Sequence, residues 1–343
     1  MAKRPRPDDP DESVPKKPRT LPPAEPSTTL AVLSWNVDTP VPFLTLSPRK
    51  AGPSLIPPGT NLSLLSDLLS RNNFPDFVCL QEVRARQTDK QWISGLKAAP
   101  TWNLAEPKYT MYSSLSRATR GQRHFGVVTY TRRPDLVAVA REVDWDAEGR
   151  VLILEMKNGW ALINVYALNG SEFMWRDPLG KVPPKTRNER KREFNQLLLE
   201  ECRAMQARGL RLVLIGDFNI SLTKRDCVPR LRTEYPHSLA RKEFQEGFIP
   251  SLDLVDVYRI LHGTQPAFSW FAKGKPQGAD CARVDYALVE RSLLSRVVET
   301  RYLEDSKERA HSDHAPVMLT LRDMQALDNP EPPSAVQSSS GIA

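Results

Sequence analysis

The sequence contains no run of apolar residues near the roughly 18 that span a membrane, and no apolar segment follows the first methionine, as a secretory signal would require. Cysteine is scarce, with 4 among 343 residues and no Cys-x-x-Cys spacing. Neither a zinc site of paired cysteines nor a disulfide framework is therefore expected. These absences predict a protein with reduced thiols that is neither secreted nor membrane-bound.

An excess of acidic residues is also absent, because 48 Lys and Arg outnumber 41 Asp and Glu and give a net charge of +7. Residues 117–133 contain five arginines and no acid, and residues 221–232 contain four basic residues and one acid. Such segments suit the phosphates of DNA, although exposed loops without a partner have the same composition. The residues predicted to contact DNA on this basis are Arg120, Arg123, Lys224 and Arg225.

Apolar residues are almost missing from the first 29 residues of the chain. Residues 1–29 are rich in proline and charge and are predicted to be disordered. Their basic clusters at residues 3–6 and 16–19, separated by acids, form a bipartite pattern that predicts import into the nucleus, with a basic linker as the alternative. Residues 323–343 are predicted to be a second disordered tail, which leaves residues 30–322 as one folded domain.

Between these ends, short apolar runs alternate with helical patterns. Two segments, 61–72 and 187–209, have helical spacing, and the second ends at Gly209 as helices often do. Many of the apolar runs are apolar on both faces, as strands covered on both sides would be. The strands are expected at 30–37, 76–83, 125–131, 151–156, 160–168, 210–219, 283–289 and 315–321. The alternation predicts a layered α/β architecture, with residues 38–59 as a long loop after the first strand.

Polar residues stand at the ends of six of these strands, in a pattern that ordinary loops do not explain. In α/β folds such ends meet along one edge, where sites are built. Asp38, Glu82 and Asp313 offer the hard oxygen ligands that suit Mg²⁺ or Mn²⁺ and not zinc.

Two further pairs at these strand ends are suited to catalysis. Asp217 and Asn219 could hold a water molecule and an oxyanion, and Asp285 could fix the tautomer of His314. A lone histidine would more often be a capping or core residue. Together with a divalent ion, the set predicts hydrolysis of a phosphate ester.

Six segments occur in a recognisable order: SWNVD, CLQEV, NVYALNG, IGDFNIS, RVDYALV and SDHAPV. Over residues 30–322 the chain resembles the endonuclease/exonuclease/phosphatase superfamily, and more closely the exonuclease III type of apurinic/apyrimidinic endonuclease. The resemblance implies a four-layered α/β sandwich of the deoxyribonuclease-I-like kind, with two packed mixed β-sheets flanked by helices.

The resemblance also implies roles for individual residues. The Mg²⁺ or Mn²⁺ ion would be held mainly by Glu82, with Asp38, Asn36 and Asp313 in or beside the site. Asp217 would orient or deprotonate the attacking water. His314, oriented by Asp285, would either bind a phosphate oxygen or act as acid and base. The remaining contacts to the scissile phosphate would come from Tyr166, Asn169, Asn219 and Asn36.

The sequence departs from this family near the expected abasic-sugar pocket. Ala282 stands where a tryptophan is often found, whereas Val284 matches an aliphatic position. Phe268 and Trp270, with Phe271, could supply the aromatic wall of the pocket or belong to an ordinary core.

The function that the resemblance implies is a Mg²⁺-dependent nuclease of base excision repair that cuts 5′ to abasic sites and cleans or degrades 3′ ends, and the bipartite basic clusters predict that it acts in the nucleus. Its partner would be duplex DNA with abasic sites or 3′ ends, and it would be a monomer. The alternatives are a phosphodiesterase for RNA tails, tyrosyl-DNA adducts or a retroelement target site, and a binding module without catalysis. The intact acids and His314 disfavour the last of these.

Overall fold

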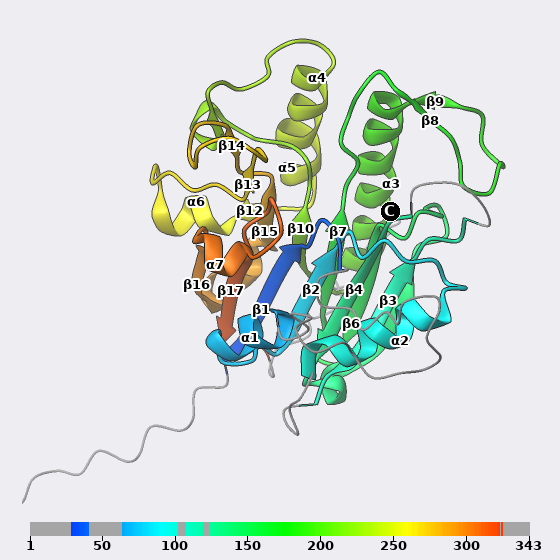
Figure 1. Cartoon of the computed structure of the whole chain (residues 1–343), viewed down its shortest axis with the longest axis vertical. Coiled ribbons are helices and arrows are strands. Elements are labelled where there is room, and N and C mark those ends of the chain that lie inside the picture. Colours follow the sequence, from blue (N-terminus) through cyan, green and yellow to red (C-terminus); the bar gives the residue numbers. More distant parts are fainter. Residues whose placement is uncertain (1–28, 41–63, 102–107, 119–123, 323, 325–343) are drawn as a thin grey trace, which may run out of the picture.

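The computed structural model describes residues 29–40, 64–101, 108–118, 124–322 and 324. These residues form two six-stranded sheets that pack face to face, with helices on the outer faces (Figure 1). The four-layered α/β sandwich is therefore confirmed. Within the described ranges, none of the helices has the length and apolar character to span a membrane. The predicted tails and most of the 38–59 loop lie outside these residues, so those expectations stay predictions.

The two sheets share a plan, because each is mixed and has its one parallel pair near the centre. In the first sheet, ordered β16-β17-β1-β2-β4-β3, the parallel pair is β1 and β2. In the second, ordered β12-β15-β10-β7-β6-β5, it is β7 and β10. The strands of the first are β1 (Thr29–Asn36), β2 (Phe77–Gln81), β3 (Thr110–Leu115), β4 (Gly126–Thr131), β16 (Val297–Tyr302) and β17 (Val317–Arg322). Those of the second are β5 (Val137–Glu142), β6 (Val151–Met156), β7 (Trp160–Tyr166), β10 (Arg211–Asp217), β12 (Leu254–Asp256) and β15 (Asp285–Glu290).

The described helices are mostly short. They are α1 (Leu64–Arg71), α2 (Lys90–Ala98), α3 (Arg187–Ala207), α4 (His237–Lys242), α5 (Ile249–Ser251), α6 (Val257–His262) and α7 (Ser306–Arg309), with a π-helical segment (Glu243–Phe248) between α4 and α5. Short 3₁₀ helices lie at Ala99–Thr101, Pro134–Leu136, Lys224–Asp226 and Arg291–Arg296. Two small sheets lie above the sandwich: β8 (Met174–Trp175) with β9 (Lys185–Thr186), and β11 (Cys227–Val228) with β14 (Cys281–Ala282) and β13 (Trp270–Phe271).

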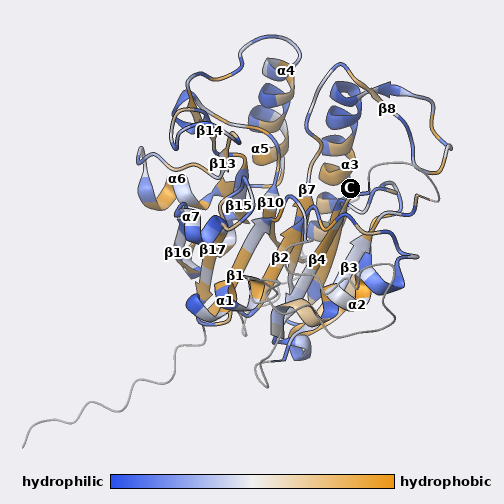
Figure 2. Cartoon of the chain, in the orientation of Figure 1, coloured by the Kyte–Doolittle hydropathy of each residue, from blue (hydrophilic) through white to orange (hydrophobic). Residues whose placement is uncertain are grey.

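Three apolar clusters separate the four layers. One lies between the sheets, a second between α1 and α2 and the first sheet, and a third between α3, the α4–α5 helix and the second sheet. Figure 2 shows the result, with apolar strands inside and polar helix surfaces outside. Helix α3 begins at a capping box, in which Thr186 and Glu189 satisfy each other's backbone N–H groups. Its first turn is thereby fixed above the end of the second sheet.

Buried hydrogen bonds tie the centres of the two sheets together. Gln81 Nε2 of β2 donates to Asn164 Oδ1 of β7 at 2.8 Å, and Asn164 Nδ2 donates to the Val128 carbonyl of β4 at 3.0 Å. Burying a polar group in an apolar layer destabilises the fold unless the group forms a hydrogen bond, so this contact favours a single alignment of the two sheets. Gln81 and Asn164 lie one and two residues before Glu82 and Tyr166, and so they align the strand ends on which those residues sit.

The eight predicted strands are all present, with bounds that differ by a few residues. In the two six-stranded sheets four strands were missed, namely β3, β5, β12 and β16, and these are their four edge strands; the two-residue strands of the small sheets were also missed. Strand β5, for example, has no buried residue. Because an edge strand is covered on fewer sides, it lacks the apolar run that identified the inner strands.

Candidate active site

One end of the sandwich gathers the polar residues of the strand ends. The carboxyl ends of the parallel strands β1, β2, β7 and β10 meet there with the amino ends of β15 and β17, which run antiparallel to β10 and β1 (Figure 1). A cleft of about 820 Å³ opens above them. Its lining includes the predicted residues Asp38, Glu82, Tyr166, Asn169, Asp217, Asn219, Asp313 and His314. Asn36 and Asp285 are buried directly beneath.

Asn36 links the metal-site residues to the residue expected to handle water. Its Nδ2 donates to Glu82 Oε1 at 3.3 Å and to Asp217 Oδ2 at 3.0 Å, while its Oδ1 accepts from the Asp38 N–H at 2.9 Å. The Tyr166 hydroxyl donates to the same Glu82 oxygen at 2.7 Å. One amide at the end of β1 therefore orients carboxylates from both sheets.

Several of these residues have a positive φ angle, a backbone conformation that residues other than glycine rarely adopt. The φ angles of Asp38, Glu82 and Asn219 are +55°, +58° and +52°. Such strain costs of order 1–3 kcal/mol at each residue and is retained mainly at functional sites. The chain thus turns sharply just after β1, β2 and β10, which directs these side chains into the cleft.

Two cations that the sequence analysis did not single out hold the carboxylates. Arg84 Nη2 donates to Asp38 Oδ1 at 2.7 Å and to Glu82 Oε2 at 3.0 Å, and Lys273 pairs with the other oxygen of Asp38. The side chains of Asp38 and Glu82 keep 22% and 17% of their surface exposed. Clustered carboxylates that face solvent and need positive charge form a hard oxygen donor set, and this set fits Mg²⁺.

His314 and Asp285 form the buried pair that the sequence predicted. His314 Nδ1 lies 2.8 Å from Asp285 Oδ2. The Ser312 hydroxyl accepts from the His314 N–H, and the Ser269 hydroxyl accepts from the Asp285 N–H, each at 2.9 Å. Since Nδ1 faces the carboxylate, Nε2 is the nitrogen left for an acceptor in the cleft.

Burial and charge shift the pKa values of this pair and its neighbour. Burial, together with the Asp285 carboxylate, raises the pKa of Asp217 to about 7. Burial disfavours a charged imidazole, but the charge and hydrogen bond of Asp285 outweigh it and raise the pKa of His314 to about 10. At neutral pH His314 is therefore an imidazolium with a proton on each nitrogen.

A second group of possible ligands lies deeper, where Asp217, Asp285 and His314 bring ligand atoms within 4.8 Å of one another. This group is buried, and His314 and Asp285 already hydrogen-bond to each other, whereas the Glu82 and Asp38 carboxylates remain partly exposed to the cleft. Asp313 borders the Glu82 group, and its Oδ2 accepts from Trp270 Nε1 at 3.3 Å. The Glu82 and Asp38 carboxylates, which belong to the metal site predicted from the sequence, are therefore a better metal site than the deeper group.

The opposite side of the cleft is basic. Lys191 comes from α3, Arg232 from the loop after β11, and His237 and Arg241 from α4, and all four line the cleft. Arg232 belongs to the predicted basic segment 221–232, although it was not one of the residues predicted to contact DNA, and the other three were not predicted. Lys191 lies four residues after Arg187, and Arg241 four residues after His237, so each pair shares a helix face. That spacing was the available signal.

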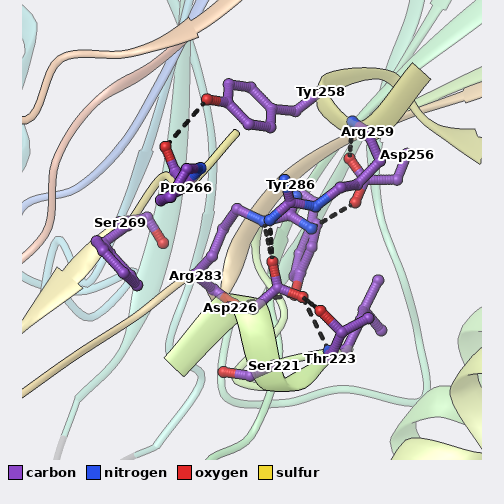
Figure 3. Close-up of polar contacts among 12 residues, drawn as sticks. Ser221, Thr223, Asp226, Asp256, Tyr258, Arg259, Pro266, Ser269, Arg283 and Tyr286 are labelled. Atoms are coloured by element: carbon purple, nitrogen blue, oxygen red, sulfur yellow. Dashed lines mark hydrogen bonds and ion pairs between the residues drawn. The ribbon is translucent and has the colours of Figure 1, made fainter. Parts of the chain in front are cut away.

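A network of buried ion pairs anchors the basic loop of residues 221–232 (Figure 3). Asp226 Oδ1 accepts from Arg283 Nε at 2.7 Å and from Arg259 Nη2 at 2.6 Å, while Arg283 Nη2 donates to Asp256 Oδ2 at 2.7 Å. The other Asp226 oxygen accepts from the N–H and hydroxyl of Thr223. The network joins the loop to the start of β15, and hence to Asp285.

Some of the residues predicted to form the substrate pocket or to contact DNA line the cleft, and others do not. Trp270 and Val284 line the cleft beside Ala282, whereas Phe268 packs against a small cluster with Phe271 and is not among the lining residues. Lys224 and Arg225 are exposed outside the lining, although they belong to the same loop as Arg232. Arg120 and Arg123 lie outside the described residues. Contacts of all these residues with DNA stay predictions.

A family model describes most of the chain. The model of the endonuclease/exonuclease/phosphatase family matches residues 33–314, and the chain belongs to this family of metal-dependent hydrolases. No protein among the curated sequences matches it.

Solved structures share the fold. The 3′-5′ exonuclease NExo of Neisseria meningitidis is 24% identical, with a TM-score of 0.59 over 84% of this chain and 98% of that one. The AP endonuclease LMAP of Leishmania major is 20% identical, with a TM-score of 0.62 over 86% and 88%. The APE2 catalytic domain of Xenopus laevis is 21% identical, with a TM-score of 0.61 over 87% and 94%. At these identities the likeness is one of fold.

Proposed function

We propose that the protein is a Mg²⁺-dependent phosphodiesterase of base excision repair that cuts duplex DNA at abasic sites and trims its 3′ ends. The observation that carries the proposal is the layout of the cleft. Carboxylates suited to a metal line one side, cationic side chains line the other, and Tyr166, Asn169 and Asn219 lie among the lining residues. A phosphodiester needs both kinds of side chain, because its charge must be neutralised while water attacks phosphorus.

The residues divide the chemistry among them. Asp217 accepts hydrogen bonds from the Asn219 N–H at 2.8 Å and from Asn36, so its carboxylate is fixed to orient or deprotonate a water molecule. His314 presents Nε2–H to a phosphate oxygen. The P–O3′ bond then breaks as the water oxygen bonds to phosphorus. A metal held by Glu82 and Asp38 would stabilise charge on the phosphate and the leaving oxygen.

Similar proteins support DNA as the substrate. A 3′ phosphatase NExo from Neisseria, 23% identical and with a TM-score of 0.60, has been solved bound to a product DNA hairpin. We further propose that the protein acts in the nucleus as a monomer, on the strength of the basic clusters at residues 3–6 and 16–19 and of the family resemblance.

The proposal is tested with three labelled duplexes, each incubated with Mg²⁺ and with a chelator. One contains a single abasic site, one is intact, and one has a recessed 3′ end. Metal-dependent incision at the abasic site and shortening of the recessed end are expected. Activity on the 3′ end alone would remove the abasic-site endonuclease from the proposal and point to Ala282 as the cause. If none of the three is cut, DNA repair is the wrong function and RNA or tyrosyl-DNA adducts are the next substrates.

A further inference from the structure

The basic side of the cleft holds positive charge that no described carboxylate neutralises. Among the residues that the structure describes, Lys191, Arg232, His237 and Arg241 form no ion pair, whereas the buried Arg283 and Arg150 each meet a carboxylate within 2.7 Å. Glu234, the acid whose charge acts on His237 and Arg241, is exposed and pairs with Arg230 at 3.5 Å, and Asp217 acts on Lys191 without forming an ion pair with it. Lys191, Arg232 and Arg241 therefore differ from the ion-paired cations Arg283 and Arg150, and His237 adds a polar ring nitrogen beside them.

The geometry of Arg241 and Lys191 is nevertheless fixed by backbone carbonyls. Arg241 Nε donates to the Ser221 carbonyl at 2.7 Å, and Arg241 Nη2 donates to the Arg232 carbonyl at 2.6 Å. Lys191 Nζ donates to the Asn219 carbonyl at 2.6 Å. Neutral acceptors hold the side chains in place but leave their charge available, which is how a preorganised anion site is built.

The four groups are close enough to repel one another. Burial is the largest of the effects that together lower the pKa of Lys191 to about 7; the Asp217 carboxylate opposes it, and the charges of Arg241 and Arg232 add to it. Burial and the charges of Arg232, Lys191 and Arg241 likewise lower the pKa of His237. Lys191 is only 4% exposed. Holding like charges together in a half-buried site is unfavourable, and a bound anion would relieve it.

The position of the group restricts which anion it receives. The Asn219 carbonyl that binds Lys191 belongs to the residue whose side chain donates to Asp217 at 2.9 Å. Lys191 is thus attached to Asn219, a predicted contact to the scissile phosphate, whereas Asp38 and Glu82 pair with other cations, Arg84 and Lys273. A nucleic-acid strand carries a phosphate at every nucleotide, so the next phosphate of the same strand falls beside the scissile one.

We propose that Lys191, Arg232, His237 and Arg241 form a binding site for the phosphate that neighbours the scissile phosphate on the cleaved strand. The inference rests on the proposed function. It assigns the basic side of the cleft to binding and registering the strand and leaves hydrolysis to the acidic side.

The test replaces single phosphates of a recessed duplex, one at a time on either side of the scissile bond, with neutral methylphosphonates. Binding is measured by fluorescence anisotropy with chelator present, so that nothing is cut, and cleavage is measured separately with Mg²⁺. The variants are Arg232→Gln, whose side chain is exposed, and Arg241→Gln. Lys242→Gln, which removes an exposed charge next to Arg241, is the matched control. Melting curves verify that each variant is folded.

For the wild-type protein, one methylphosphonate next to the scissile phosphate should raise Kd about tenfold. Arg232→Gln or Arg241→Gln should also raise Kd for the unmodified duplex about tenfold. For these variants, the methylphosphonate next to the scissile phosphate should not raise Kd any further. Lys242→Gln should keep the full methylphosphonate effect.

Two results would overturn the inference while the proposed function stands. In the first, the protein binds and cuts DNA, but the loss of affinity caused by the variant and the loss caused by the methylphosphonate multiply at every phosphate position tested. In the other, the variants lose affinity only for duplexes that carry a terminal phosphate, which would assign the site to a chain end. A wild-type protein that neither binds nor cuts DNA would refute the proposed function, and the inference with it.

Discussion

The two sides of the cleft are built in different ways. Most acidic residues of the site stand at an end of an inner strand or one or two residues beyond it, as Asp38, Glu82 and Asp217 do, and Asp313 lies four residues before β17. The basic residues come from the first turns of α3, from α4 and from the loop between them, which is anchored by the Asp226 network. The acidic side therefore takes its geometry from the sheets, and the basic side depends on elements that pack above them.

This difference suggests a division of work. Groups that act on the reacting atoms must be placed closely, and packed strands supply that precision. Groups that bind a flexible strand can tolerate more freedom. Changes on the acidic side should therefore lower kcat, whereas changes on the basic side should raise Kd and KM. The following substitutions test that division, beginning with the largest effect.

Replacing Glu82 with Gln should give the largest loss. It removes the charge that would hold the metal, and a metal contributes several kcal/mol to stabilisation of the transition state, so kcat should fall about 10³-fold or more. Affinity for DNA with chelator present should change little. Steady-state cleavage and anisotropy together measure both effects. The control is Glu299→Gln, an exposed glutamate on β16. If Glu82→Gln cleaves at the wild-type rate, the metal is held elsewhere.

Replacing Asp285 with Asn should have the next largest effect. The amide can still contact His314 Nδ1, but it no longer fixes the ring with a charge, and kcat should fall about 10²-fold or more. Single-turnover cleavage at saturating protein isolates this step from binding. Asp253→Asn, an exposed aspartate in another Arg pair, is the control. Equal losses in the two variants would show that the His314–Asp285 pair has no catalytic role.

The same contrast explains what the sequence could predict. Asp38, Glu82, Asp217 and Asp313 adjoin apolar runs, so their place at one edge of a sheet follows from the strand pattern. Lys191 and Arg241 lie on helix faces, where a cation more often indicates solvent than a site. Which helix face borders the cleft is decided by packing between elements far apart in sequence, and a single sequence does not reveal it.

The edge strands, and the cations Arg84 and Lys273 that pair with Asp38, were missed for related reasons. Strand β5 is exposed, and its sequence therefore lacks an inner strand's apolar run. Arg84 and Lys273 reach Asp38 from segments 189 residues apart (273 minus 84). Only the close approach of β2 and the segment after β13 brings them together.

Replacing Asp226 with Asn tests whether the basic side depends on its buried network. Arg283 and Arg259 would each lose a charged partner, so the free energy of unfolding should fall by about 3 kcal/mol or more. Because the loop of residues 221–232 would be less well held, Kd for DNA should rise, while kcat at saturating DNA changes less. Urea denaturation and anisotropy measure the two quantities.

The matched control is Glu290→Gln. It breaks the Arg211–Glu290 pair at the far end of β15, where the carboxylate is also buried. It should destabilise the fold without altering Kd. If both variants weaken DNA binding equally, loss of stability alone accounts for the effect, and the network has no special role in the cleft.

Removal of residues 1–28 should have the smallest effect on cleavage. All described residues that line the cleft come from Asp38 onward, and β1 begins at Thr29. Neither side of the cleft should therefore change, and kcat and KM should equal those of the full chain.

The fraction of the protein in the nucleus should fall, because the two basic clusters are lost. A tandem fluorescent fusion, too large to enter the nucleus passively, measures that fraction, and Lys16→Gln with Lys17→Gln in the full chain tests the second cluster alone. A truncated fusion that still enters the nucleus would exclude the import signal, and a rise in KM on truncation would extend the basic side of the cleft to residues 1–28.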